Sequence, residues 1–220
     1  MALILHIDTA VTAASVCLAQ NGNLLSLSKN NNQKDHSAWL HGAIKEILES
    51  NDCEIGSIDA VAVIEGPGSY TGLRIGMASA KGICYALNKQ LITLNTLLVM
   101  ANAAKDEETD LLCPMIDARR MEVFTALYTK SLELVKEPAA ITLHENSFDE
   151  ELTSNSICFF GNGSDKFHKI KSNGSAVFKN IDFDAASMVS LAERKFQKKE
   201  FANLAYVEPL YLKEFYTPTR

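Results

Sequence analysis

Long hydrophobic runs are missing from this sequence. Its apolar stretches are interrupted well before the roughly 18 residues that a membrane-spanning helix requires. The opening residues, Met1–Ile7, also lack the basic region and the small-residue cleavage site of a secretory signal peptide. We therefore expect a cytoplasmic protein that makes no contact with a membrane.

Paired cysteines are missing as well. The five cysteines are odd in number and scattered through apolar segments, and they form no C-x-x-C pair. Thiols with this distribution are usually reduced core residues, so the sequence predicts neither disulfides nor a structural zinc site. The residues concerned are Cys17, Cys53, Cys84, Cys113 and Cys158.

Basic charge is in short supply: 21 Lys and Arg stand against 27 Asp and Glu, a formal net charge of −6. Because affinity for a polyanion comes largely from neutralising phosphates, this chain is a poor candidate for binding nucleic acid alone. With 47% hydrophobic and 22% charged residues, the composition is that of an ordinary globular protein with a sizeable core.

What is present first is a pattern of strands and helices typical of an α/β protein. An antiparallel meander is predicted at the N-terminus, with Asn21-Gly22-Asn23 as its hairpin turn. Apolar residues at helical spacing then indicate helices over 36–50 and 71–87, and a further helix that ends near Ala104. The expected strands of this half lie at 3–7, 13–19, 23–27, 58–65 and 91–94.

The second half of the chain repeats the opening of the first. Asp117 ends an apolar run as Asp8 does, and an offset of 109 residues superposes the two. A coincidence of three strands is the alternative to a duplicated α/β unit. We predict two lobes, 1–106 and a smaller, degenerate 107–220. Expected in the second lobe are strands at 111–116, 123–128, 157–160 and 206–212, a strand through Val135, and a helix at 185–196.

Asp8 and Asp117 are candidate residues for holding Mg²⁺ or orienting a phosphate. Each stands at the carboxyl end of a strand, and duplicated α/β folds bind their ligands between the two halves at these strand ends. Thr9, Gly161 and Gly163 complete the candidate nucleotide site. The turns after the two aspartates contain no glycine, however, so an equally good interpretation is that each aspartate caps its own turn.

The segment Gly66–Gly76 follows a strand and opens a helix, which is the geometry of an anion site. It fits neither G-x-x-x-x-G-K-[ST] nor G-x-G-x-x-G. Small residues recur every four positions along this helix and form two faces with little bulk: Gly72, Gly76 and Ala80 on one, and Ala78, Gly82 and Ala86 on the other. One face can pack on the chain's own sheet and the other can receive a partner helix, or both can pack internally.

Two residues of the preceding helix invite other interpretations. His36 and His41 are five positions apart rather than four, which disfavours a metal site. Trp39 lies at the margin of the apolar face, a position typical either of a core or of an interface. We find no Ser–His–Asp or Cys–His arrangement and no G-x-S-x-G motif.

The motifs together resemble the TsaB (YeaZ) family of bacterial subunits required for making threonylcarbamoyladenosine in tRNA. The resemblance is carried by Ile7-Asp8-Thr9-Ala10, Gly66-Pro67-Gly68-Ser69-Tyr70-Thr71-Gly72-Leu73-Arg74-Ile75-Gly76, Lys81-Gly82 and Ile116-Asp117-Ala118-Arg119-Arg120. It extends to Pro209-Leu210-Tyr211-Leu212 and implies a two-lobed actin/Hsp70-like fold, the ribonuclease H-like unit duplicated, with a degenerate second lobe.

The resemblance also implies a role. A TsaB-like protein is expected to be a non-catalytic scaffold that binds and activates the catalytic paralogue TsaD, with TsaE docking on the pair. It also forms homodimers and meets tRNA only through the complex. No H-x-x-x-H motif, through which TsaD binds its metal, occurs here. The implied partner interface comprises His36, Trp39, Leu40, Ala43, Gly72, Gly76, Met77, Ala78, Lys81, Gly82 and Tyr85.

No cofactor is expected to be required, although ATP, ADP or Mg²⁺ would bind weakly at a degenerate site or at the complex interface. The main alternative is a stand-alone nucleotide-binding hydrolase or kinase of the same fold, which would depend on Asp8 and Asp117. A metallopeptidase is a third alternative, and it would require bound zinc.

Overall fold

The computed structural model describes residues 2–32, 35–171 and 174–213, which form two compact units. Unit 1 comprises the described residues of Met1–Val99 and Phe183–Pro209, and unit 2 those of Met100–Asp182 and Leu210–Arg220. The predicted lobes, 1–106 and 107–220, differ from these units because the segment 183–209 returns to unit 1. Parts of both predicted lobes lie outside the described residues, at 1, 33–34, 172–173 and 214–220.

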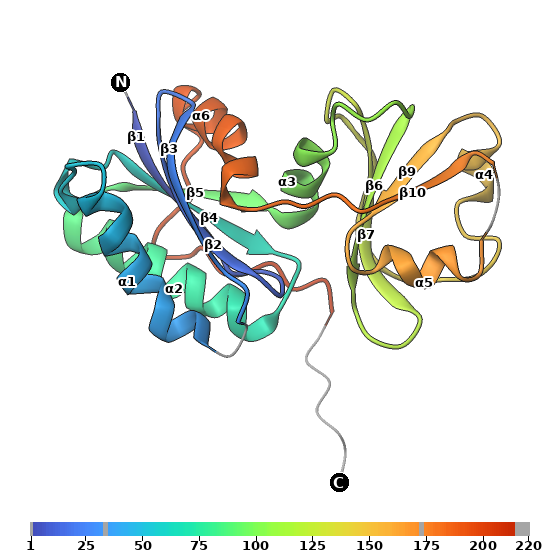
Figure 1. The fold of residues 1–220 in the computed structure, drawn as a ribbon, viewed down its shortest axis with the longest axis horizontal. Helices are drawn as coiled ribbons and strands as arrows, with labels where there is room; N and C mark the ends of the chain where they lie inside the picture. Colours follow the sequence, from blue (N-terminus) through green and yellow to red (C-terminus); the bar gives the residue numbers. More distant parts are fainter. Residues whose placement is uncertain (1, 33–34, 172–173, 214–220) are drawn as a thin grey trace, which may run out of the picture. The chain divides into compact units, whose positions relative to one another are not determined.

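Unit 1 is built on a mixed five-stranded sheet with the strand order β3-β2-β1-β4-β5 (Figure 1). β1, β2 and β3 pair in antiparallel fashion, whereas β1–β4 and β4–β5 are parallel pairs. At the β2–β3 hairpin, Asn21 and Gly22 both have positive φ, as the two central residues of a type I′ turn require. The strands are β1 (Leu3–Asp8), β2 (Ala14–Gln20), β3 (Asn23–Asn30), β4 (Ala60–Gly66) and β5 (Gln90–Asn95).

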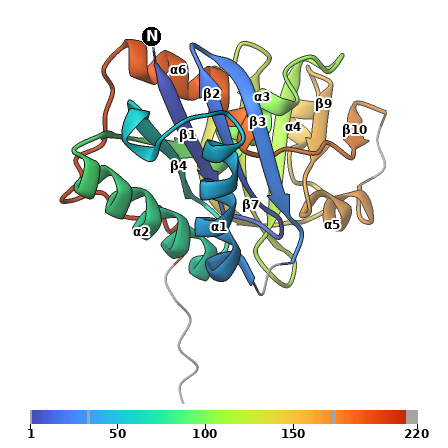
Figure 2. The ribbon, with the colours of Figure 1, turned by 60° about the vertical axis from the view of Figure 1, so that its left-hand side comes forward.

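Helices cover both faces of this sheet. Figure 2 shows α1 (His36–Glu49) and α2 (Tyr70–Leu87) on one face and α6 (Val189–Gln197) on the other. α6 follows a 3₁₀ turn, η3 (Ala185–Met188), which is anchored by a 2.9 Å hydrogen bond from the Ala185 amide to Ser15 Oγ of β2. A second 3₁₀ turn, η2 (Ile55–Ser57), follows α1.

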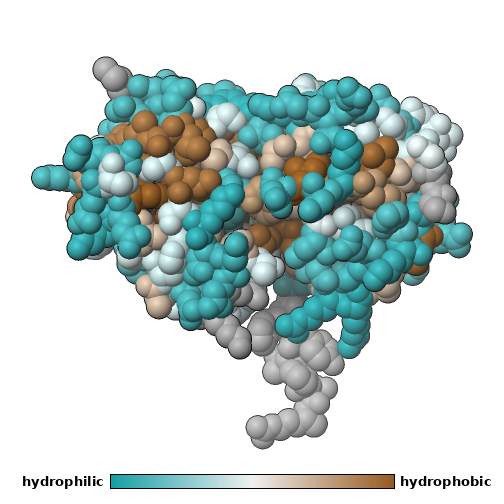
Figure 3. All heavy atoms as spheres, viewed as in Figure 1, coloured by the Kyte–Doolittle hydropathy of each residue, from teal (hydrophilic) through white to brown (hydrophobic). Residues whose placement is uncertain are grey.

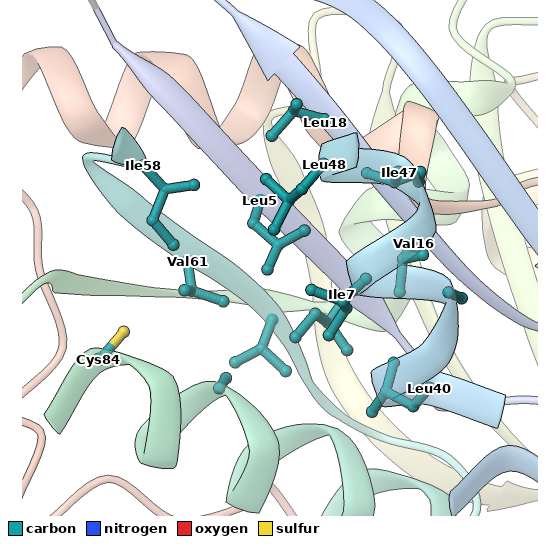
Figure 4. Packing of buried hydrophobic residues seen from close by; sticks show 14 of the residues in the cluster. Leu5, Ile7, Val16, Leu18, Leu40, Ile47, Leu48, Ile58, Val61 and Cys84 are labelled. Atoms are coloured by element: carbon teal, nitrogen blue, oxygen red, sulfur yellow. The ribbon is translucent and has the colours of Figure 1, made fainter. Parts of the chain in front are cut away.

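The core of unit 1 lies between the sheet and the pair α1 and α2. Figure 4 shows Leu5 and Ile7 of β1, and Val16 and Leu18 of β2, with Leu40, Ile47 and Leu48 of α1 packed over them. Alternate residues of a strand point to one face, which is why Leu3, Leu5 and Ile7 all enter this core. This packing fixes the positions of α1 and α2.

Unit 2 repeats the same topology with shorter helices. Its sheet has the order β10-β9-β6-β7-β8, so β6 takes the place of β1 and β9 that of β4. Phe148, Phe159, Phe167 and Phe178 form an aromatic cluster in its core. The elements are α3 (Thr96–Ala103, which begins in unit 1), β6 (Leu111–Asp117), β7 (Glu122–Thr129), β8 (Leu134–Thr142), α4 (Asp149–Leu152), β9 (Ile157–Phe160), α5 (Ser164–His168) and β10 (Ala176–Lys179).

Most predicted elements are confirmed, and the identical strand order supports the predicted duplication. The predicted terminal strand 206–212 is wrong. This segment joins no sheet: the amides of Tyr206 and Val207 bond locally to Asn203 O, and Pro209 has no amide to donate. Within the described residues, no helix combines the length and apolarity that crossing a membrane demands.

Candidate functional site

The turn after β1 is packed tightly against the glycine-containing loop that leads into α2. Thr9 Oγ1 donates to the Gly72 carbonyl at 2.7 Å, and the Ser69 amide donates to the Ala10 carbonyl at 2.6 Å. A Cβ on Gly68 would lie 2.3 Å from Ala10 O, and one on Gly72 would lie 2.0 Å from Thr9 O. The absence of a side chain at Gly68 and Gly72 therefore allows the backbone of Thr9 and Ala10 to pack directly against the loop.

The amides at the start of α2 are also engaged within the chain. Ser69 is the N-cap, and its Oγ accepts from the Gly72 amide at 3.3 Å. The loop is held from the other side by Thr96 Oγ1, which donates to Pro67 O at 2.6 Å. Two of the amides that an anion site would use, those of Ser69 and Gly72, thus have partners in this chain.

Asp8 is buried beneath this turn, with only 1% of its surface exposed. Burial raises the pKa of its carboxyl to about 6, and the charge of Asp184 acts in the same direction. The Ala10 amide, which donates to Asp8 Oδ1 at 2.9 Å, partly opposes this effect. Two residues earlier on β1, burial lowers the pKa of His6 to about 4. Asp8 therefore stops its strand and bonds its own turn.

Asp117, the counterpart of Asp8 in unit 2, is exposed and already bonded. It accepts from Lys166 Nζ at 2.7 Å and from the Arg119 amide at 2.6 Å, and its own amide donates to Asn162 Oδ1 at 2.9 Å. Partial burial raises the pKa of this carboxyl, but the bonds from Lys166 and Arg119 outweigh it and hold the pKa below the ordinary value.

Gly161 and Gly163 pack against the end of β6 as Gly68 and Gly72 pack against the turn after β1. Gly161 has φ 90°, and a Cβ there would lie 2.5 Å from Met115 O. A Cβ on Gly163 would lie 2.9 Å from Val123 Cγ1, and the Gly163 amide donates to Met115 O at 3.0 Å. These two glycines serve close backbone packing in unit 2, while Asp8 and Thr9 lie in unit 1.

The two small-residue faces of α2 have different environments. Gly72, Gly76 and Ala80 are buried against the sheet, and a Cβ on Gly76 would lie 2.4 Å from Thr9 Oγ1. Six residues predicted to form a partner interface are therefore internal: His36, Leu40, Ala43, Gly72, Gly76 and Met77. Leu40, Ala43 and Met77 belong to the core of unit 1, Gly72 and Gly76 pack against Thr9, and His36 is buried beside Thr12 of the turn after β1.

The opposite face of α2 borders an open groove of about 460 Å³, which we call the α1–α2 groove. His41 Nε2 lies 3.4 Å from Ser79 Oγ, a contact that joins the two helices. The lining contains no Asp, Glu, Lys or Arg, and it consists of His41, Ile55, Ala78, Ser79, Gly82, Ile83, Ala86 and Leu87.

One glycine of the groove, Gly82, and one exposed glycine of α1, Gly42, have open space around them. A Cβ on Gly82 of α2, or on Gly42 of α1, would have no atom within 4 Å. Gly82 therefore differs from Gly76, six residues earlier on the same helix, whose Cβ would overlap Thr9 Oγ1. The fold of unit 1 explains Gly76 and leaves Gly82 and Gly42 unexplained.

The other predicted interface residues have mixed positions. Trp39 is half-buried against the core, and Lys81 donates to Val207 O at 2.9 Å, which holds the returning segment on α2. Tyr85 is 83% exposed. On the face in Figure 3, hydrophobic side chains reach the surface in separate patches among hydrophilic ones. Among the described residues of unit 1, the large exposed hydrophobic ones are Leu24, Leu25, Ile55, Tyr85 and Tyr206.

The four-residue spacing identified Ala78, Gly82 and Ala86 as one face of the helix without saying whether it is exposed, and the contributions of Ile55 and Ser79 to the groove were missed. Ile55 comes from a 3₁₀ turn without periodicity, and Ser79 joins the groove through its contact with His41. Gly42, in the middle of a predicted helix, was a signal that the sequence did offer for the exposed surface of α1.

Comparison with known proteins places the chain in a family. The TsaD family model, described as tRNA N6-adenosine threonylcarbamoyltransferase, matches residues 25–217. The tRNA threonylcarbamoyladenosine biosynthesis protein TsaB of Buchnera aphidicola subsp. Baizongia pistaciae is 30% identical over 222 residues, with 96% of this chain and 98% of the relative covered. TsaB of Escherichia coli is 35% identical over 129 residues, 58% of this chain and 55% of the relative.

Solved structures agree on the fold. A Pseudomonas aeruginosa protein described as similar to peptidase YEAZ superposes with a TM-score of 0.86 at 22% identity, over 97% of this chain and all of that one. An activator of 2-hydroxyisocaproyl-CoA dehydratase from Clostridium difficile, solved with bound ADPNP, gives a TM-score of 0.51 at 9% identity, over 92% and 98% of the two chains. The fold is therefore α/β, two-lobed and actin/Hsp70-like, as predicted. By sequence and fold together, the chain belongs to the TsaB (YeaZ) family of tRNA threonylcarbamoyladenosine biosynthesis proteins.

Proposed function

We propose that this chain is a non-catalytic subunit in the threonylcarbamoylation of the tRNA adenosine next to the anticodon. It acts by binding TsaD through the α1–α2 groove, and TsaE docks on the resulting pair. The observation that carries the proposal is the open space at Gly82 in an uncharged groove, with a second open glycine, Gly42, on the exposed surface of α1.

The energetics of these glycines support a partner. A glycine in a helix interior costs about 1 kcal/mol relative to alanine, and both residues lie inside helices. Within this chain a methyl group would fit at either position. Close approach of another backbone, as where two helices cross at small residues, gives the missing reason for glycine.

The lining also fits a helix from another protein. An uncharged groove between two helices is the surface on which an amphipathic helix lays its apolar face. Such a contact activates a partner only if it is stronger with the partner's active conformation than with the inactive one. We propose that TsaD presents that helix, and that a second copy of this chain uses the same groove in a homodimer.

The carboxylates and glycine loops support a non-catalytic role. The backbone of Thr9 and Ala10 fills the space that Gly68 and Gly72 would leave for a phosphate, and Asp117 is bonded to Lys166. We propose that no cofactor is required, with ATP, ADP or Mg²⁺ binding only weakly at this degenerate site or at the complex interface. The chain would contact tRNA only as part of the complex. We place that complex in the cytoplasm, where the five free thiols stay reduced.

Co-expression with TsaD tests the proposal. Ala78→Trp and Gly82→Trp should abolish co-purification, because an indole would fill the groove that receives the partner helix. Gly174→Trp, a change at an exposed glycine of unit 2 with open space around it, is the matched control and should co-purify normally. Circular dichroism and thermal unfolding establish that all three variants fold. Undiminished binding by both groove variants would remove the groove from the interface.

A further inference from the structure

The hairpin between β6 and β7 holds two consecutive arginines in an unfavourable backbone conformation. Arg119 has φ 69° and Arg120 has φ 50°, a region that L-residues other than Asn, Asp and Gly rarely adopt. Glycine or asparagine would relieve the strain at either position. The geometry of the turn therefore does not require arginine at either position. Residues kept in strained conformations cluster at binding and active sites.

Hydrogen bonds fix this turn on the end of the sheet. The Ala118 amide donates to Glu122 O and the Glu122 amide to Arg119 O, both at 3.0 Å. The Arg119 amide is held by Asp117 Oδ1, and Met121 O accepts from the Leu143 amide at 2.7 Å. Both arginines are exposed on this well-bonded tip. The backbone that carries the two arginines is thus held in place on the surface of unit 2, with both side chains open to a ligand.

The charges around the tip favour an anion. The two carboxylates that flank the arginines in sequence, Asp117 and Glu122, are paired with Lys166 and Lys213. Among the residues that the structure describes, no carboxylate forms an ion pair with Arg120. The tip therefore carries two positive charges in excess on a chain whose net charge is −6.

We infer that Arg119 and Arg120 bind adjacent phosphates of an RNA backbone. The inference rests on the proposed function, which brings tRNA to the complex. A guanidinium is a planar fork of donors that matches the oxygens of a phosphate, and neighbouring phosphates present two such acceptors in a row. Two phosphate contacts are too few for an acidic protein to bind RNA by itself, so these contacts increase the affinity of the assembled complex for tRNA.

A second exposed basic pair, Lys198–Lys199, serves as a comparison. Lys199 also has positive φ, at 57°, but it lies just beyond the end of α6. A left-handed residue after a helix is the ordinary way to end it, so this conformation needs no functional explanation. Cations at a helix C-terminus are likewise favoured by the helix dipole. The pair matches the hairpin in formal charge and exposure, and differs from it in having a local structural reason and an ion pair, from Lys198 Nζ to Glu200 Oε1 at 3.9 Å.

The test is the salt dependence of tRNA binding by the assembled complex of this chain with TsaD, followed by fluorescence anisotropy of labelled tRNA between 50 and 200 mM KCl. Each phosphate contact contributes about one to the slope of log affinity against log salt. Arg119→Gln/Arg120→Gln should therefore lower that slope by about two and weaken binding at low salt. Arg119→Lys/Arg120→Lys should restore most of the slope, and Lys198→Gln/Lys199→Gln should leave it unchanged.

The outcomes separate this inference from the proposed function. Failure of the wild-type chain to co-purify with TsaD would reject the proposed function. Normal co-purification with an unchanged slope in the glutamine variant would reject the RNA contact alone. Loss of co-purification in the glutamine variant, rescued by the lysine variant, would assign the arginines to an acidic segment of the partner protein and overturn the inference.

Discussion

Replacing Gly42 and Gly82 by alanine should make this chain more stable and its complex weaker. Each methyl group enters open space, in the α1–α2 groove at Gly82 and on the exposed surface of α1 at Gly42, so nothing in the chain opposes it. Each glycine inside a helix costs about 1 kcal/mol relative to alanine, and the two lie on different helices. If the effects add, the double variant gains about 2 kcal/mol. For a chain of this length, that gain raises Tm by about 4–8 °C.

The same methyl groups should disturb a partner helix. Overpacking a well-packed contact typically costs about 1–3 kcal/mol, which weakens binding about 5- to 150-fold. Thermal unfolding of the isolated variants measures the first effect, and titration with purified TsaD measures the second. A higher Tm together with a lower affinity for TsaD is the combination expected if these glycines serve the complex and not the fold of this chain.

Gly76→Ala provides the matched control on the same helix. Its Cβ would lie 2.4 Å from Thr9 Oγ1, so the change should destabilise the chain instead of stabilising it. If Gly82→Ala also lowered Tm, the chain itself would use that glycine. If the Gly42→Ala/Gly82→Ala variant gained stability and bound TsaD with unchanged affinity, binding of TsaD would not explain why these positions hold glycine.

Three further predictions follow from the buried groups and glycine loops. Asp8 and His6 should have opposite effects on the free energy of unfolding between about pH 4 and 6. Because the pKa of Asp8 is raised in the folded chain, its ionisation lowers the free energy of unfolding by about 3 kcal/mol as pH rises. Because the pKa of His6 is lowered, its deprotonation raises the free energy of unfolding by about the same amount. Urea unfolding of Asp8→Asn should therefore show stability rising with pH over this range, whereas the same rise in wild type would refute the cancellation. Gly161→Ala should destabilise unit 2 by about 2 kcal/mol or more, since its Cβ would lie 2.5 Å from Met115 O and its φ is 90°; an unchanged Tm would contradict this. Calorimetry with Mg·ATP on the isolated chain should show no turnover, and tight binding abolished by Asp8→Ala would instead favour the hydrolase or kinase.

The helices, the strands and the duplication could be predicted from the sequence, because all of them depend on local patterns of apolar and turn-forming residues. The Asn21-Gly22 turn and the runs ending at Asp8 and Asp117 located the strands correctly. The unit boundaries depend instead on contacts between distant residues. The bond from the Ala185 amide to Ser15 Oγ joins positions 170 apart, and that from Lys195 Nζ to Thr93 O joins positions 102 apart. No local pattern announces such contacts.

The candidate site could be predicted only in part for a similar reason. The two faces of α2 have almost the same composition, so their sequences do not say which one the sheet covers. The contact of Gly72 and Gly76 with Thr9 decides it, and that contact depends on how the β1–β2 turn folds. At the β6–β7 hairpin, arginine is among the residues least expected with positive φ, so turn chemistry gave no signal there.

The duplicated unit explains why one turn is buried and its counterpart is exposed. In unit 1 the loop after β4 leads into α2, an 18-residue helix whose glycines let it cover Thr9 and Ala10. In unit 2 the corresponding loop after β9 leads into α5, which has only five residues. The end of β6 still packs against Gly161 and Gly163, but Arg119 and Arg120 beyond it remain exposed. The short helix of unit 2 thus leaves this turn exposed, whereas the long helix of unit 1 covers its turn with one face and borders the α1–α2 groove with the other.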